Sequence, residues 1–123
     1  MKISIITVVY NNQTTIRQAI ESVLNQSYPN IEYVIIDGNS KDNTISIIEE
    51  YNNRLGYFIS EPDKGLYDAM NKGIRAATGD VIGILNSDDL YQDLDVIKDV
   101  MQQFNNDPKL DILYGDLVYV KSD

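Results

Sequence analysis

Short apolar runs alternate along this chain with segments whose apolar residues recur every three to four positions. The runs are rich in β-branched residues and end in polar turns, which is typical of strands buried in a sheet. They predict strands at residues 3–9, 31–36, 56–60 and 81–85, and one or two last strands within 110–114 and 117–120.

The segments between these runs have the apolar spacing of one helical face. The four faces consist of Ile16, Ala19, Ile20, Val23 and Leu24; Thr44, Ile47, Ile48 and Tyr51; Leu66, Ala69, Met70, Gly73, Ile74 and Ala77; and Ile97, Val100, Met101 and Phe104. Thr15 and Gln18 have the spacing of a capping box before the first helix. The last helix is expected from about residue 93 to residue 104, and Gly73 predicts close approach of the third helix to the sheet.

Alternation of strands and helices predicts the α/β class. We expect a mostly parallel sheet with helices on both faces and right-handed crossovers. With 123 residues the chain can form one domain with a substantial core, so residues 1–123 are interpreted as a single domain.

The amino-acid composition excludes several classes of partner and of catalytic or metal site. Ten basic against nineteen acidic residues give a net charge of −9, which argues against a nucleic-acid partner or an anionic membrane surface. The chain has no cysteine and no histidine, so thiolate metal sites, disulfides and imidazole catalysis are excluded. No stretch approaches the ~20 apolar residues of a membrane span, so we expect no transmembrane segment.

Polar loops follow three predicted strands at the point where each strand ends. They comprise residues 10–12, 37–42 and 86–89. Because the carboxyl ends of parallel strands meet at one edge, we expect the loops to form a single cleft. The chain has neither a P-loop nor a dinucleotide fingerprint, so phosphates bound there would need another source of positive charge.

A divalent cation bound by Asp88 and Asp89 would supply that positive charge, since carboxylate oxygens suit Mg²⁺ or Mn²⁺. The alternative is that Ser87 and the two acids cap the next helix. Asp37 has a similar alternative as a turn residue that bonds its own loop, and Tyr10 could pack at the end of its strand. Asp80 is interpreted as a turn residue that precedes a strand.

Four motifs together resemble the family 2 glycosyltransferases, which have the GT-A fold. They lie at residues 4–11, 34–44, 79–80 and 85–89, in the order and spacing of that family. Residues 61–73, which begin Glu61-Pro62-Asp63-Lys64-Gly65, resemble a branch associated with bacterial surface-polysaccharide assembly. The resemblance covers almost the whole chain.

The resemblance implies inverting transfer of a sugar from a nucleotide donor, usually UDP-linked, to an acceptor hydroxyl. By position, Val8, Val9 and Tyr10 would lie against the base, and Asp37 would lie beside base and ribose. Asp88 would meet the ribose and, with Asp89, a Mn²⁺ or Mg²⁺ ion on the diphosphate.

The start of the third predicted helix adds one more candidate. Lys64, Tyr67, Asp68 and Asn71 flank this start, which would face the cleft. Exposed polar residues of a helix are usually only solvated. We include Asn71 among the nucleotide-binding candidates.

Two positions depart from the family pattern. Gly38 stands where many members carry a second acid that contacts uracil, and Asn86 stands at the first acid of the Asp-x-Asp element. An inverting transfer also needs a carboxylate base on the acceptor side. The resemblance places that base beyond residue 123, so we expect a truncated GT-A fold, the N-terminal donor-binding part of a longer catalytic domain.

The expected partners are a nucleotide-diphosphate sugar and a glycan or lipid-linked acceptor. The expected location is the cytoplasm, either free or peripheral at the inner face of the membrane. A different class of function stays open, because a non-catalytic nucleotide-sugar-binding or regulatory module would keep the same fold. A phospho-acceptor receiver domain does not fit, since it needs an acid pair after the first strand, where this chain has Tyr10-Asn11-Asn12.

Overall fold

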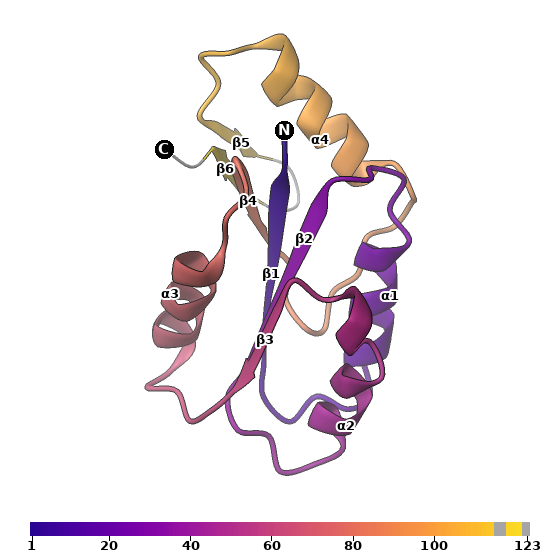
Figure 1. Ribbon diagram of the computed structural model, residues 1–123, viewed down its shortest axis with the longest axis vertical. Helices are drawn as coiled ribbons and strands as arrows, with labels where there is room; N and C mark the ends of the chain where they lie inside the picture. Colours follow the sequence, from indigo (N-terminus) through magenta and orange to yellow (C-terminus); the bar gives the residue numbers. More distant parts are fainter. Residues whose placement is uncertain (115–117, 122–123) are drawn as a thin grey trace.

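A computed structural model describes residues 1–114 and 118–121 of the chain. Strands and helices alternate along it (Figure 1). In chain order the elements are β1 (Ile3–Val9), α1 (Ile16–Leu24), β2 (Ile31–Asp37), α2 (Thr44–Glu49), the 3-10 turn η1 (Asn52–Arg54), β3 (Tyr57–Ser60), α3 (Leu66–Ala76), β4 (Val81–Ile84), α4 (Val96–Asn106), β5 (Ile112–Tyr114) and β6 (Val118–Lys121).

The described strands form one six-stranded sheet in the order β3-β2-β1-β4-β6-β5. The first four strands run parallel, with β1 between β2 and β4. β6 is antiparallel to β4, and β5 is antiparallel to β6. The predicted mostly parallel α/β sheet is therefore confirmed, and the antiparallel pair at one edge is an addition.

Helices cover both faces of the sheet, as predicted. Because successive side chains of a strand point to opposite faces, β1 contributes to two separate apolar clusters. Ile3, Ile5 and Val9 pack with residues of α1 and α4, whereas Ile6 and Val8 pack in the cluster that includes Ala69 of α3. In Figure 1, α3 lies on one side of the sheet and α1, α2 and α4 lie on the other.

Close approach of α3 to the sheet depends on Gly73, as predicted. A Cβ atom at this position would lie 2.5 Å from Cγ2 of Ile6, a fully buried side chain. Real Cβ atoms do not come so close to a neighbour. The missing side chain therefore sets the distance between α3 and β1.

The predicted capping box at the first helix is wrong. Thr15 occupies the N-cap of α1 but makes no capping hydrogen bond with its side chain. Its hydroxyl instead donates to the carbonyl oxygen of Ser87 at 2.9 Å, in a loop 72 residues further along the chain. The Thr15 hydroxyl thus bonds to a distant loop and not to the first turn of its own helix.

The end of the chain differs from prediction in its boundaries. Helix α4 begins at Val96 and not near residue 93, because the Asp93 carboxylate accepts a hydrogen bond from the amide of Asp95 and forms a turn before the helix. Strand β5 begins at Ile112, two residues after the expected start. Residues 115–117, including the predicted start of the last strand, lie outside the described residues.

Within residues 1–114 and 118–121, no helix combines the length and the apolar character needed to cross a membrane.

Candidate functional site

β1, β2 and β4 end at the same edge of the sheet. Val9 and Asp37, the last residues of β1 and β2, are paired in register. The amide of Gly38 donates to the carbonyl of Val9 at 2.9 Å, and the amide of Leu85 donates to the carbonyl of Ile6 at 2.9 Å. The three polar loops predicted to share an edge therefore do so.

Hydrogen bonds join the first of these loops to the second. The amide of Asn11 donates to Oγ of Ser40 at 2.8 Å, and the amide of Lys41 donates to Oδ1 of Asn11 at 2.7 Å. Asn11 and Asn39 both have positive φ angles, 47° and 70°, which asparagine tolerates better than most residues. The two loops thus form one connected surface.

Asn12 connects the first loop to the third. Its amide group Nδ2 donates to Oγ of Ser87 at 2.9 Å, and its backbone amide donates to Oγ1 of Thr44 at 2.9 Å. Together with the bond from Thr15 to Ser87, these contacts fix the turn that carries Asp88 and Asp89. The positions of the three loops are thereby set by one another.

Asp37 is fully buried beneath the second loop. Its Oδ2 atom accepts hydrogen bonds from the amide of Ser40 at 2.8 Å and from Oγ of Ser60 at 2.7 Å. Its Oδ1 atom accepts one from Oγ of Ser40 at 2.6 Å. The local bonding considered for Asp37 is therefore present, and the side chain also joins the ends of β2 and β3.

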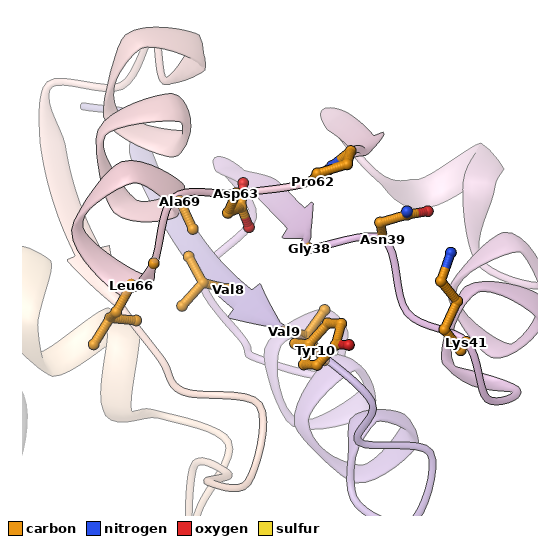
Figure 2. A pocket seen from close by; sticks show the side chains of 11 residues that line it. Val8, Val9, Tyr10, Gly38, Asn39, Lys41, Pro62, Asp63, Leu66 and Ala69 are labelled. Carbon is orange, nitrogen blue, oxygen red and sulfur yellow. The ribbon is translucent and has the colours of Figure 1, made fainter.

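A pocket of about 540 Å³ opens at this edge of the sheet. Figure 2 shows that its side chains come from the end of β1, from the loop after β2, from the segment between β3 and α3, and from the start of α3. The lining residues are Val8, Val9, Tyr10, Gly38, Asn39, Lys41, Pro62, Asp63, Gly65, Leu66 and Ala69. Its volume falls within the range of small-molecule sites.

Val8, Val9 and Tyr10, three predicted site residues, all line this pocket. The two valines are buried and supply an apolar wall, whereas Tyr10 is 60% exposed at the rim. The alternative of Tyr10 as a packed strand-end residue therefore does not describe its position. An apolar wall with an exposed aromatic ring suits a flat, partly polar ligand.

Asp88 and Asp89 lie outside the pocket lining, on the turn after β4. Both are exposed, and neither carboxylate has a hydrogen bond or ion pair within the described part of the chain. The capping alternative is wrong, because the next helix begins only at Val96 with Asp95 at its N-cap. Among the described residues, no group of three or more acidic side chains is placed to hold a metal ion.

Asn71 and Asp80 also lie outside the pocket. Asn71 is exposed on α3. Asp80 lies at the opposite edge of the sheet, where its Oδ2 atom accepts a hydrogen bond from the amide of Lys2 at 2.9 Å. The interpretation of Asp80 as a turn residue that precedes a strand is confirmed.

A fourth loop, between β3 and α3, contributes to the pocket and was missed as a site loop. It supplies Pro62, Asp63 and Gly65, followed by Leu66 and Ala69 of α3. The signal was present, since residues 61–65 also follow a predicted strand. Only the helix start that follows these residues was placed toward the cleft.

Comparison with known proteins identifies the family. The model of the family "Glycosyl transferase family 2" matches residues 4–122. The chain belongs to glycosyl transferase family 2. The resemblance inferred from the four sequence motifs is therefore confirmed.

Curated relatives from this family extend well beyond the matched region. An uncharacterized glycosyltransferase of Mycobacterium tuberculosis is 33% identical over 114 residues, 92% of this chain and 44% of that protein. A PGL/p-HBAD biosynthesis glycosyltransferase of Mycobacterium bovis is 30% identical over 118 residues, 94% of this chain and 46% of that protein. The chain thus spans less than half of the length of these two relatives.

Solved structures agree with the family assignment. TarS of Staphylococcus aureus in complex with UDP-GlcNAc has a TM-score of 0.79 and 27% identity over 86% of this chain and 32% of that chain. A mannosyltransferase from Pyrobaculum calidifontis, in complex with GDP-Man and Mn²⁺, has a TM-score of 0.87 at 21% identity. It covers 98% of this chain and 44% of that chain, and it shows the shared fold alone. The expected GT-A fold is confirmed.

Proposed function

We propose that this family 2 chain binds the donor in an inverting glycosyltransferase. The donor is a nucleoside diphosphate sugar, UDP-linked in our proposal, and its sugar is transferred to an acceptor hydroxyl during glycan synthesis. The observation that carries the proposal is the pocket lined by Val8, Val9 and Tyr10 at the carboxyl edge of the sheet. Ligands of open α/β sheets bind at this edge, and similarity to TarS bound to UDP-GlcNAc supports the ligand class.

The nucleoside would occupy the pocket with its base against Val8, Val9 and the ring of Tyr10. Asp37, the candidate beside base and ribose, is fully buried and already accepts three hydrogen bonds. We therefore assign its contribution to the loop that it holds, since Gly38, Asn39 and Lys41 line the pocket. Asn71 stays a candidate contact from the exposed surface of α3.

The diphosphate would lie toward Asp88 and Asp89, with Asp88 also meeting the ribose. Two exposed carboxylates that have no partner within residues 1–114 and 118–121 suit a divalent cation that keeps water and phosphate oxygens as its other ligands. Asp88 and Asp89 would hold Mn²⁺ or Mg²⁺, and the bound ion would neutralise charge on the diphosphate leaving group. With a net charge of −9, the chain itself offers little positive charge for that purpose.

The acceptor and the location belong to the same proposal. The sequence likeness of residues 61–73 to surface-polysaccharide enzymes favours a glycan or lipid-linked acceptor. We place the protein in the cytoplasm or peripherally at the inner face of the membrane, where such an acceptor would meet the donor.

Calorimetry with UDP tests the proposal directly. We expect the chain to bind UDP more tightly with Mn²⁺ than without it. Asp89→Ala is expected to weaken binding in Mn²⁺ about tenfold or more, because a charged ligand of the ion is lost. Asp99→Ala, which removes an exposed acid in the first turn of α4, is the matched control and should bind as the wild type does.

Two results would count against the proposal. If no nucleoside diphosphate binds, with or without Mn²⁺, the donor site is refuted. If UDP binds equally well without the metal and in Asp89→Ala, the pocket stands but the role of the acidic pair is refuted.

A further inference from the structure

The lack of a side chain at Gly38, which lines the pocket, leaves space that another residue occupies. A Cβ atom at position 38 would lie 3.0 Å from Oδ2 of Asp63 and 3.4 Å from Cδ1 of Tyr10. The carboxylate of Asp63 therefore occupies space that a side chain at position 38 would need. The loop after β3 thus places a carboxylate directly beside the loop after β2.

Lys72 fixes the orientation of this carboxylate. Its Nζ atom lies 2.7 Å from Oδ1 of Asp63, 3.1 Å from the carbonyl oxygen of Pro62 and 3.1 Å from Oε1 of Glu61. The side chains of Lys72 and Asp63 are only 17% and 12% exposed. The hydrogen bond with Asp63 raises the pKa of Lys72, so the lysine stays charged and donates to Oδ1.

The second oxygen of Asp63 is free to accept a bond from a ligand. Within residues 1–114 and 118–121, Oδ2 has no hydrogen-bond donor, and Asp63 is the acidic residue in the pocket lining. Much of the remaining lining is apolar, with Val8, Val9 and Leu66 among it. A fixed acceptor in such surroundings discriminates strongly between ligands that can donate to it and ligands that cannot.

We propose that Asp63, held by Lys72, selects the base of the donor by accepting a hydrogen bond from a ring N–H group. This inference rests on the proposed donor site. Uracil and guanine carry a ring N–H on the edge that pairs with another base. Cytosine and adenine carry an unprotonated nitrogen there, which repels a carboxylate. The donor class is therefore a uracil or guanine nucleotide.

Asp63→Asn should invert this preference. The ammonium of Lys72 can only donate, so the amide oxygen of the new side chain turns toward Lys72. The amide NH₂ group then faces the pocket in place of Oδ2. A donor in this position opposes uracil and guanine and favours cytosine and adenine.

The experiment is calorimetry of the chain with UDP, GDP, CDP and ADP in the presence of Mn²⁺. The wild type should bind UDP or GDP roughly tenfold or more tightly than CDP and ADP, since a hydrogen bond to a charged group is gained. Asp63→Asn should reduce that ratio about tenfold or reverse it. Glu61→Gln, which weakens another Lys72 contact outside the pocket lining, is the matched control and should keep the wild-type preference.

Failure of the inference is distinguishable from failure of the proposed function. If the wild type binds none of the four nucleotides, the donor site itself is refuted. If it binds them without the expected ranking, or if Asp63→Asn keeps the ranking, only the role of Asp63 is refuted. Asp63→Ala provides a second variant. It removes both the acceptor and the repelling charge, so the ratio of UDP or GDP affinity to CDP or ADP affinity should fall toward one.

Discussion

Asp37 is a buried side chain that holds the loops around the pocket without lining the pocket itself. Its carboxylate accepts hydrogen bonds from the amide and hydroxyl of Ser40 and from the hydroxyl of Ser60. These bonds connect the loop after β2 to the end of β3. The loops that line the pocket on two sides are therefore held by the same acid.

Replacement of Asp37 tests this structural role. Asp37→Asn keeps the size of the side chain but replaces one acceptor oxygen with a donor, so at least one buried donor of Ser40 or Ser60 loses its partner. We expect the free energy of unfolding to fall by about 2 kcal/mol, measured by urea denaturation. Asp80→Asn, at the exposed opposite edge, should change it by less than about 0.5 kcal/mol. Equal stability of both variants would contradict the assigned role.

The strand signal placed a polar loop at the end of the first apolar run, and the family resemblance singled out Val8, Val9 and Tyr10 there. All three line the pocket, and their contact with a nucleotide base stays a prediction. The meeting of Gly38 with Asp63 could not be predicted from sequence, because it depends on how close two loops come in space. The same limit applies to Thr15. Its sequence pattern predicts a capping hydrogen bond within the helix, but its hydroxyl bonds to the carbonyl oxygen of Ser87, 72 residues away.

At the scale of elements, one acid joins the amino ends of three strands. Glu32 in β2 accepts a hydrogen bond from Oγ of Ser4 in β1 at 2.6 Å. It also accepts bonds from the amide and hydroxyl of Thr78, before β4, at 2.8 and 2.9 Å. Burial alone would raise the pKa of Glu32, but these bonds and the nearby charge of Lys2 outweigh it and lower the pKa.

The lowered pKa of Glu32 predicts an acid-sensitive contribution to stability. This contribution is present above the unfolded-state pKa, about 4.3 for glutamate, and is lost as the pH falls through the lower folded-state pKa. Urea denaturation at pH 7 and pH 3 should therefore show a smaller difference between the two pH values for Glu32→Gln than for the wild type. An unchanged pH dependence would show that Glu32 contributes nothing to it.

Element identity and order could be predicted because apolar periodicity differs between strands and helices. Strand direction at the edge could not, since the residues of β5 and β6 carry no pattern that separates antiparallel from parallel pairing. The start of α4 was displaced for a local reason, the turn between Asp93 and Asp95. Apolar periodicity predicts which face of α4 is buried, but it does not predict the turn that delays the start of the helix.

In the molecule as a whole, the loops with the candidate site residues gather at one edge of the sheet. Four loops meet there, three of them carry the pocket, and the fourth carries Asp88 and Asp89. At the opposite edge, hydrogen bonds that involve Lys2, Glu32 and Asp80 hold the amino ends of the strands together. Membership of glycosyl transferase family 2 fits this division, because its donor would bind where the loops meet.

A titration followed by ¹H–¹⁵N NMR would show directly whether a nucleoside diphosphate binds at this edge. With UDP and Mg²⁺, we expect the largest amide shifts at residues 8–10, 38–41, 63–66 and 86–89. Amides around Lys2, Glu32 and Asp80 should barely move. The largest shifts at that opposite edge, or no shifts at saturating UDP, would show that the donor does not bind where the loops meet.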